Sequence, residues 1–297
     1  MVSLLPQDFI AHTWHTVRAE LARLVDCVTV DLEIVPGLLD TGQPEFRRVS
    51  NEKGDRYWLP WTAYLGAWIS AEGQIVTLLI SDRATLANVE GPLTTGLVSV
   101  ITGACINLQG QVAIHANAVE LGGWAIAFVG YSGMGKSTLS AYCTLQGAGF
   151  VTDDVLIVNQ EGLVKQGLPR LKLYPEVGES LGLEVAHKTS YKFYYHPNQP
   201  NGELPQRSAP LGILYFLAES PDQTIYSQPV ASGQAVFNLL SHSYYAADLI
   251  PESPDLLDSY VQVVAQTTVK QLFYPRNLSL LPQVYDLLMQ EVCALGL

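Results

Sequence analysis

Basic residues are scarce in this sequence. Its 297 residues include 16 Lys and Arg against 28 Asp and Glu, which gives a formal net charge of −12. Nucleic-acid-binding proteins gain much of their affinity from cationic side chains on the phosphate backbone, so this balance argues against a nucleic-acid partner. Apart from the pair Arg47 and Arg48, the basic residues are scattered along the chain.

Long apolar runs and paired cysteines are also missing. The longest apolar stretches, such as 65–70 and 75–80, are far shorter than a membrane span. The first residues lack the basic region and the apolar stretch of a secretory signal peptide. The four cysteines stand far apart without a CxxC pair, which argues against a zinc site and a disulfide framework. We therefore expect a cytoplasmic protein without a membrane partner.

Hydrophobic residues are plentiful, at 48% of the chain, and only 15% of the residues are charged. A chain of this length and composition buries a substantial core, in one large domain or two smaller ones. In residues 1–108 the pattern predicts a helix over 8–26, a strand over 28–35, an antiparallel β region over 46–82 and a helix over 91–107. This part is expected to form a smaller α+β module that serves recognition or dimerisation.

The hydrophobic pattern changes near residue 110. Strands are predicted over 112–121 and 124–130, followed by a glycine-rich loop, a helix over 137–146 and a strand over 150–158. Further strands are predicted over 170–174 and 211–217, and helices over 233–249, 253–266 and 279–295. This alternation predicts an α/β domain over 109–297. One continuous fold for the whole chain is the alternative.

The glycine-rich loop carries the clearest motif. Its sequence, GYSGMGKS, matches G-x-x-x-x-G-K-[ST] in full, between a predicted buried strand and a predicted helix. Glycines let the backbone approach phosphate oxygens, and the N–H groups of the loop and the helix N-terminus point at the anion. The residues expected to bind the phosphates are Gly130, Tyr131, Ser132, Gly133, Met134, Gly135, Lys136, Ser137 and Thr138. A glycine-rich turn that binds nothing is the alternative.

Two residues of this loop have individual roles in the prediction. Lys136 would place its ammonium group on the β and γ phosphates of a nucleoside triphosphate such as ATP. The hydroxyl group of Ser137 would hold Mg²⁺.

Adjacent carboxylates, Asp153 and Asp154, close the strand predicted after the loop helix. Two carboxylates side by side repel each other unless a cation or a proton compensates them. Beside a phosphate loop, one of them could hold Mg²⁺ and the other could accept a proton from an attacking hydroxyl group. An ordinary acidic strand end is the alternative.

A histidine, His115, lies on the strand before the loop strand. By itself, a single histidine in an apolar strand is typical of a hydrogen-bonded core residue.

The stretch HANAVEL…AIAFVGYSGMGKSTLSAYCTLQGAGFVTDD resembles the catalytic core of the HPr kinase/phosphorylase family. That family has a histidine on the preceding strand, a GxSGxGKS loop and an Asp-Asp pair after a helix that ends in Gly. Later segments, such as SAPLGILYFLAE and LFYPRNLSLLPQVYDLL, are similar to shorter HPr-kinase-like serine kinases, some of which accompany peptide-modification clusters. The resemblance covers most of 109–297 and none of 1–108.

The resemblance implies an α/β P-loop domain of the HPr kinase and phosphoenolpyruvate carboxykinase type. It implies that His115, Lys136 and Asp154 occupy active-site positions. Asp154 would be the base in phosphorylation, and Asp153 would support the metal ion or the base. Because the family often assembles, a homo-oligomer is a further expectation.

The sequence departs from the family at one metal position. HPr kinases carry a glutamate before an Arg-Gly loop, whereas here Arg170 follows Leu168 and Pro169 without an acid. The second metal ligand is therefore unassigned, with Glu176 and Glu179 as nearby candidates. Arg170 could neutralise the transferred phosphoryl group or form a structural salt bridge, and Lys192 is a weaker candidate of the same sort. The family's loop for docking HPr is not recognisable, so HPr is not the expected acceptor.

The sequence therefore predicts a kinase that uses ATP and Mg²⁺ to phosphorylate a hydroxyl group, with a serine of a peptide or protein as acceptor. One alternative is a kinase for a small hydroxy metabolite. Another is a nucleotide-dependent switch protein that transfers no phosphate to a substrate. The phosphate loop does not read the base, so the donor could also be GTP, ADP or pyrophosphate.

Overall fold

The computed structural model describes residues 5–39, 46–52, 54–92, 96–188, 192–197 and 208–296. The fold is mixed α/β with several sheets. The described residues group into two units. The first comprises those up to Gly110 together with Tyr244–Glu252, and the second comprises Gln111–Ser243 and the chain from Ser253 onward. No helix within the described ranges is both long and apolar enough to cross a membrane.

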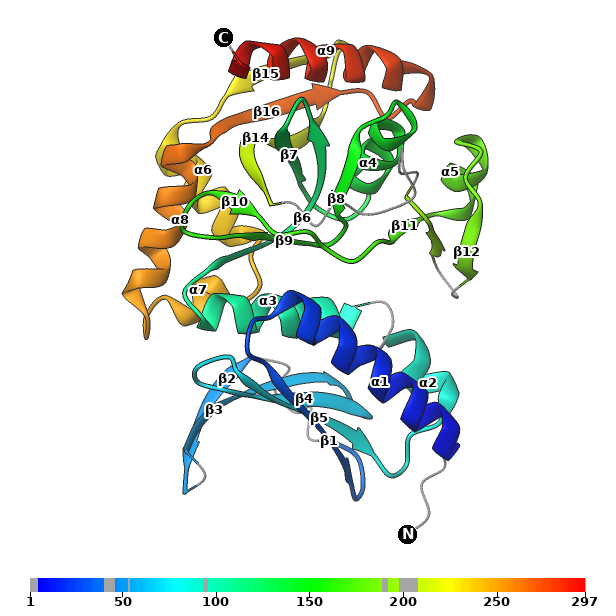
Figure 1. Cartoon of the computed structure of the whole chain (residues 1–297), viewed down its shortest axis with the longest axis vertical. Coiled ribbons are helices and arrows are strands. Elements are labelled where there is room, and N and C mark those ends of the chain that lie inside the picture. The colour runs from blue at the N-terminus through cyan, green and yellow to red at the C-terminus, as the bar shows by residue number, and fades with distance from the viewer. Residues whose placement is uncertain are drawn as a thin grey trace. The chain divides into compact units, whose positions relative to one another are not determined.

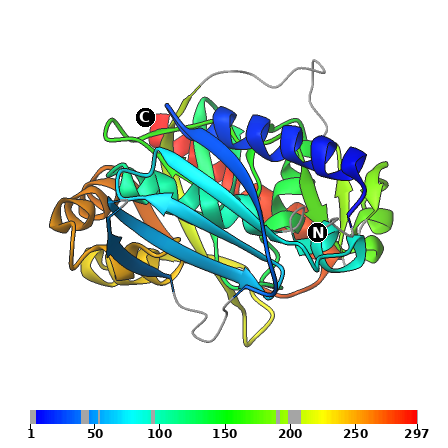
Figure 2. The ribbon, with the colours of Figure 1, turned by 90° about the horizontal axis from the view of Figure 1, so that it is seen from below.

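The first unit is a sheet with helices on one face. Its strands are β1 (Thr29–Val35), β2 (Arg47–Asn51), β3 (Gly54–Thr62), β4 (Leu65–Ser70) and β5 (Ile75–Ser81), in the order β1-β5-β4-β3-β2. Strands β2 to β5 are antiparallel, as predicted for 46–82, whereas β1 pairs with β5 in parallel. Helices α1 (Gln7–Leu24) and α3 (Val98–Leu108) lie on the same face of this sheet (Figure 1 and Figure 2).

A segment from far along the chain completes this unit. It contains the short helix α7 (Ala246–Leu249). The side-chain amide of Asn107 donates a hydrogen bond to the carbonyl oxygen of Tyr244 at 2.7 Å. The ring of Tyr245 stacks on Phe46 with centroids 4.3 Å apart. Sequence periodicity did not predict this excursion, because it depends on contacts between residues more than a hundred positions apart.

The second unit is built on a larger sheet. Its strands are β6 (Val112–Leu121), β7 (Trp124–Val129), β8 (Gly149–Thr152), β9 (Val155–Val158), β10 (Leu163–Val164), β14 (Ala209–Glu219), β15 (Tyr226–Pro229) and β16 (Thr268–Tyr274). The order is β10-β9-β6-β7-β14-β16-β15, and β8 also pairs with β6. Strands β7, β14 and β16 are parallel, so their carboxyl ends lie at one edge of the sheet. The loops that follow β7 and β16 therefore meet at this edge.

Helices cover this sheet and fix the position of the loops. Helices α4 (Lys136–Leu145) and α9 (Leu281–Cys293) share one apolar cluster with the buried side chains of β7, β14 and β16, and this cluster includes Phe128, Tyr215 and Leu272. Helices α6 (Ser232–Ser241) and α8 (Pro254–Gln266) pack on each other (Figure 1). The hydroxyl group of Tyr260 in α8 donates a hydrogen bond to the carbonyl oxygen of Ala113 in β6.

A small sheet stands beside the main one in the second unit. It consists of β11 (Leu171–Leu173), β13 (Phe193–Tyr195) and β12 (Val185–Lys188), in that order, with the short helix α5 (Pro175–Ser180) between β11 and β12 in the chain. Its inner side chains pack with Ala141 of α4 and Phe150 of β8 in a second apolar cluster. This contact holds the small sheet against the loop helix α4.

Three predicted elements were wrong in their extent. The helix predicted over 91–107 begins later, as α3 at Val98, while its first two residues end another helix, α2 (Leu86–Pro92), and residues 93–95 lie outside the described ranges. The helix predicted over 233–249 is α6 and α7, separated at Tyr245, whose φ of 60° is left-handed and breaks the helix. The strand predicted over 150–158 is β8 and β9, separated at the two aspartates.

Candidate functional site

The glycine loop connects β7 to α4 in a conformation that depends on glycine. Gly133 and Gly135 have φ angles of 83° and 93°, which other residues rarely adopt. A side-chain carbon on Gly135 would also collide with the hydroxyl oxygen of Tyr274 at the end of β16. That hydroxyl group donates a hydrogen bond to the carbonyl oxygen of Met134 at 2.7 Å. The loop is therefore tied to the neighbouring strand end, and its shape tolerates no side chain at Gly135.

Lys136, the first residue of α4, folds its side chain back into the loop. Its ammonium group donates a hydrogen bond to the carbonyl oxygen of Gly130 at 2.6 Å and a longer one to Tyr131 at 3.4 Å. The side chain is buried, and this burial lowers the pKa of Lys136, against the opposing attraction of Asp154 and Asp153. A positive charge thus sits within the loop at the N-terminus of α4, where the helix dipole also favours an anion.

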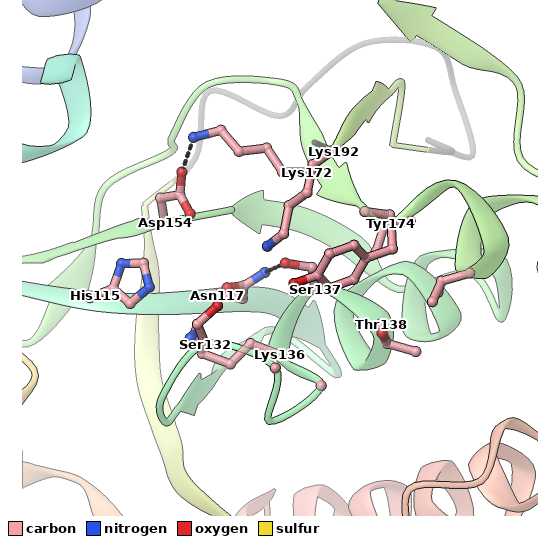
Figure 3. Close-up of a pocket in the computed structure, with 14 residues that line it drawn as sticks. His115, Asn117, Ser132, Lys136, Ser137, Thr138, Asp154, Lys172, Tyr174 and Lys192 are labelled. Carbon is pink, nitrogen blue, oxygen red and sulfur yellow. Dashed lines mark hydrogen bonds and ion pairs between the residues drawn. The ribbon is translucent and has the colours of Figure 1, made fainter. Parts of the chain in front are cut away.

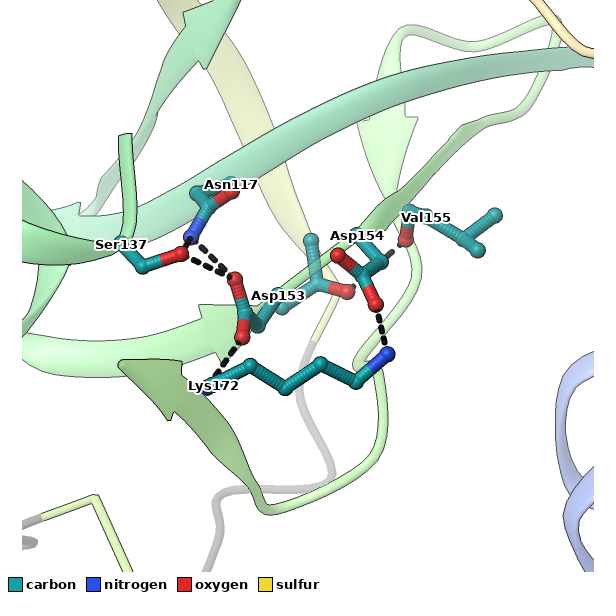
Figure 4. A network of polar contacts seen from close by, with 7 residues as sticks. Asn117, Ser137, Asp153, Asp154, Val155 and Lys172 are labelled. Atoms are coloured by element: carbon teal, nitrogen blue, oxygen red, sulfur yellow. Dashed lines mark hydrogen bonds and ion pairs between the residues drawn. The ribbon is translucent and has the colours of Figure 1, made fainter. Parts of the chain in front are cut away.

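Three polar side chains converge one residue further into the helix (Figure 4). The hydroxyl group of Ser137 donates a hydrogen bond to Oδ1 of Asp153 at 3.0 Å. The amide nitrogen of Asn117, in β6, donates to the hydroxyl oxygen of Ser137 at 3.3 Å and also to Oδ1 of Asp153. Residues from β6, α4 and the β8–β9 break therefore meet at one point.

The chemistry of this group fits a divalent cation. Asn117 is fully buried, and among the described residues its Oδ1 has no hydrogen-bond partner. A buried amide oxygen without a partner is costly, and a bound cation would compensate it once the amide turns its oxygen, in place of its nitrogen, towards Ser137 and Asp153. Hydroxyl, amide and carboxylate oxygens are also the ligands that Mg²⁺ accepts. No group of three or more His, Cys, Asp or Glu side chains in the described part of the chain could hold a metal ion.

The two aspartates lie in the break between β8 and β9, and both of these strands pair with β6. Asp154 has a φ of 84°, a left-handed conformation that costs on the order of 1 kcal/mol outside glycine. The backbone of Ala116 donates a hydrogen bond to the carbonyl oxygen of Asp154 at 3.1 Å and holds the turn. As a result the two side chains diverge, with Asp153 towards Ser137 and Asp154 towards Lys172 (Figure 4).

Lys172 in β11 serves both carboxylates. Its ammonium group forms an ion pair with Oδ2 of Asp154, and its backbone N–H donates a hydrogen bond to Oδ2 of Asp153 at 2.6 Å. Burial would raise the pKa of Asp154, but the positive charge of Lys172 outweighs it and lowers the pKa to about 2. Burial and the charge of Asp154 raise the pKa of Asp153 to about 6. The neighbours thus have very different affinities for a proton.

His115 lies in β6 two residues before Asn117, on the same face of the strand. Its backbone N–H donates a hydrogen bond to the carbonyl oxygen of His242 at 2.7 Å. Burial lowers the pKa of His115 to about 4, with Lys136 and Lys172 acting in the same direction and Asp154 opposing them. The imidazole is therefore neutral near pH 7 and would act through hydrogen bonds, not as a cation.

Most of these side chains, though not Asp153, surround a cavity of about 270 Å³, which we call the loop cavity (Figure 3). Its walls are formed by His115, Asn117, Ser132, Gly133, Gly135, Lys136, Ser137, Thr138, Asp154, Lys172, Leu173, Tyr174, Val177 and Lys192. Three ammonium groups and one carboxylate face this space, although the chain as a whole is acidic. The cavity therefore suits an anion.

Some of the predicted residues lie elsewhere. Gly130, Tyr131 and Met134 do not line the loop cavity, and the side chain of Tyr131 is 71% exposed, with its ring 4.8 Å from that of His242. Nor does Arg170 line it. The guanidinium group of Arg170 lies 5.5 Å from the ring centroid of Tyr194.

The weaker metal candidates Glu176 and Glu179 are exposed on α5 and are also absent from the cavity lining. Lys192 does line the cavity, and its ammonium group is 5.1 Å from the ring centroid of Tyr174.

Sequence reasoning missed Asn117 and Lys172. A signal for Asn117 was present, since it alternates with His115 on a strand whose other residues are almost all apolar. Lys172 gave a weaker signal, as a lysine between two leucines in a short apolar strand. The burial of this lysine is explained by its ion pair with Asp154, which the sequence does not reveal.

No family model matches the chain, and no match was found among curated proteins. Among solved structures, the chain is similar to the Hpr(Ser) kinase/phosphatase from Coxiella burnetii, with 13% sequence identity over 62% of this chain and 92% of that chain, and a TM-score of 0.34. A likeness this distant carries no argument about the activity, which has to be inferred from the site itself.

Proposed function

We propose that this protein is a magnesium-dependent kinase that transfers the terminal phosphate of a nucleoside triphosphate to a hydroxyl group, with a serine of a peptide or protein as the acceptor. One observation carries the proposal. The glycine loop with Lys136 and Ser137 shares a cavity with a second set of charged groups, Asp154 and Lys172, that nucleotide binding alone does not require. Binding needs the loop, whereas transfer to a hydroxyl group also needs a proton acceptor and extra positive charge.

In this proposal the phosphates occupy the loop cavity. The N–H groups at the start of α4 and the ammonium group of Lys136 bind the β and γ phosphates. Lys136 exchanges its contacts with the carbonyl oxygens of Gly130 and Tyr131 for phosphate oxygens. The oxygens of Ser137, Asp153 and Asn117 are the groups that would hold Mg²⁺. When bound, Mg²⁺ would neutralise negative charge on the phosphates.

Lys172 and Asp154 act on the group being transferred. The ammonium group of Lys172 moves towards the terminal phosphate and stabilises the charge that develops there. As it leaves Asp154, the carboxylate loses the positive charge that lowers its pKa and becomes a better proton acceptor. Asp154 then takes the proton of the acceptor hydroxyl group while the oxygen bonds to phosphorus and the bond to the leaving diphosphate breaks. Neutral His115 orients oxygens by hydrogen bonding.

The size of the loop cavity supports an acceptor that reaches in from outside. Pockets that enclose a drug-sized ligand measure roughly 300–1,000 Å³. The loop cavity, at about 270 Å³, has little room for a whole second molecule beside a triphosphate. A serine side chain that projects from a peptide needs less of this volume than an enclosed metabolite does.

A transfer assay with γ-labelled ATP and Mg²⁺ tests the proposal. Three acceptor pools are offered, namely serine-containing peptides, free hydroxy metabolites and a host-cell lysate, with the Lys136→Ala variant as control. Label in peptide or protein from the wild type alone is the expected result. Label in small molecules alone would replace the acceptor with a metabolite. Tight ATP binding without label in any pool would favour a nucleotide-dependent switch.

A further inference from the structure

A second cavity adjoins the loop cavity, and none of the roles proposed above involves it. It measures about 250 Å³, and four residues, Gly133, Gly135, Thr138 and Val177, line both spaces. The rest of its wall consists of Met134, Leu139, Tyr274, Arg276, Asn277, Leu278 and Leu281. We call it the side cavity. The glycine loop and the first turn of α4 are thus a wall common to two spaces.

The topology of the sheet explains why the side cavity lies there. Strands β7 and β16 both run parallel to β14, so the glycine loop and the segment after Tyr274 leave the sheet at the same edge. In open α/β sheets, ligands bind at the carboxyl ends of the strands. The segment 275–280 is therefore placed to contact a ligand whose phosphates are held by the loop.

Contacts between the two loops make this wall firm. Besides the hydrogen bond from Tyr274 to Met134, the guanidinium group of Arg276 lies 3.1 Å from the sulfur of Met134. The same guanidinium group forms an ion pair with Glu219 at the end of β14, at 3.2 Å. Asn277 accepts hydrogen bonds from the backbone and the hydroxyl group of Ser279, which shapes the turn before α9. Side chains of three strand ends thus shape one cavity.

The composition of the side cavity differs from that of the loop cavity. Its walls are mainly apolar, with Met134, Leu278 and Leu281 offering surfaces against which a flat ring can pack. Arg276 and Asn277 supply polar groups at exposed positions, suited to hydroxyl groups and ring nitrogens. A second cluster of phosphates would find only one positive charge here.

We propose that the side cavity holds the nucleoside of the phosphate donor, a proposal that rests on the proposed function. The triphosphate runs from Lys136 past Thr138, one of the four residues that line both spaces, and the base packs against Leu278 and Met134. The ribose lies near Arg276 and Asn277. The donor is then a nucleotide, and pyrophosphate or tripolyphosphate would leave the side cavity without a ligand.

The test compares two probes, Mg·ATP and Mg·tripolyphosphate, by isothermal titration calorimetry on the full chain. Wild type should bind ATP at least about tenfold more tightly than tripolyphosphate, because only ATP fills the side cavity. Leu278→Trp places a large ring in the cavity and should weaken ATP at least about tenfold while leaving tripolyphosphate within about twofold. Leu278 is 39% exposed, so the substitution should not prevent folding.

The control is Val261→Trp, an apolar position on α8 that is 47% exposed and lies outside both cavities. It should change neither affinity. Equal affinities of the wild type for both probes, or an unchanged ratio in Leu278→Trp, would overturn the nucleoside assignment while the phosphate site stood. Failure of both probes to bind would overturn the proposed function, and this inference with it.

Discussion

Lys172 and Asp154 form a largely buried ion pair on one wall of the loop cavity, although Lys172 lies in β11 and Asp154 lies 18 positions earlier, in the break between β8 and β9. Their side chains are 8% and 20% exposed, respectively. Burial of either charge alone would carry a large desolvation penalty, and the attraction between the two charges offsets it. Within the proposed mechanism, it also keeps the cation and the proton acceptor together until a phosphate arrives.

Removal of one partner of the ion pair should therefore destabilise the fold more than removal of both. Lys172→Met leaves Asp153 and Asp154 adjacent and without the nearby ammonium group, and it should lower the free energy of unfolding by about 3–5 kcal/mol. Lys172→Met combined with Asp154→Asn removes both charges and should recover most of that loss. Urea denaturation at pH 7 measures both variants. Equal instability of the single and double variants would show that the ion pair has no such role.

Asn117 should be a ligand of the cation and not only a support for Asp153. Asn117→Asp keeps an oxygen but loses the N–H donor, whereas Asn117→Leu loses both. If Asn117 is a ligand, Mn²⁺ binding measured by electron paramagnetic resonance should persist or strengthen in Asn117→Asp and weaken about tenfold or more in Asn117→Leu. If it only positions Asp153 through its amide nitrogen, both variants should weaken Mn²⁺ binding alike.

Gly135 should tolerate no substitution. Gly135→Ala places a side chain on a residue with a φ of 93° and against the hydroxyl group of Tyr274. We therefore expect the free energy of unfolding to fall by about 1–2 kcal/mol. We also expect no measurable ATP binding. Gly233→Ala in α6 is the matched control, because a side-chain carbon there meets no atom within 4 Å. It should leave ATP affinity unchanged and stabilise the fold by up to about 1 kcal/mol. Equal ATP affinities in the two variants would show that the loop conformation is unimportant.

Glu291 should make the second unit sensitive to acid. This residue of α9 pairs with Lys270 at 2.8 Å and accepts hydrogen bonds from Tyr215 and Ser227. Burial would raise its pKa, but these partners together lower it below the ordinary 4.5. Because the folded-state pKa is the lower one, the stabilisation is complete above pH 4.5 and is lost as the pH falls below it.

Glu291→Gln should therefore lower the free energy of unfolding by about 1–3 kcal/mol at pH 7, and the difference from wild type should shrink below pH 4.5. Denaturation at several pH values measures this. The exposed Glu184→Gln is the control and should stay within about 0.5 kcal/mol of wild type throughout. A difference that grew towards low pH would contradict the assigned direction of the pKa shift.

The sequence predicted the elements that depend on local pattern. The two strands before the glycine loop and the helix after it were predicted almost residue by residue, because continuous apolar runs and glycine turns mark their limits. The breaks were missed where tertiary contacts override the pattern. Tyr245 takes a left-handed conformation and stacks on Phe46, which no helical periodicity reveals.

The candidate site was predictable where residue type alone indicates the chemistry. Lys136, Ser137 and the two aspartates were selected on the motif and the pairing of carboxylates, and the fold brings them together. Asn117 and Lys172 were missed because an amide and a lysine have many ordinary uses. Burial distinguishes both residues from ordinary asparagines and lysines, and Asn117 also has an oxygen without a partner in the described chain.

Phosphate transfer with Asp154 as the proton acceptor is tested most directly by the transfer rate of Asp154→Asn, with ATP affinity measured on the same preparation. The amide keeps the size of the side chain but cannot take a proton at neutral pH. We expect ATP affinity within about threefold of wild type and transfer to the acceptor reduced on the order of 10²-fold or more. Transfer at the wild-type rate by this variant would contradict this role of Asp154.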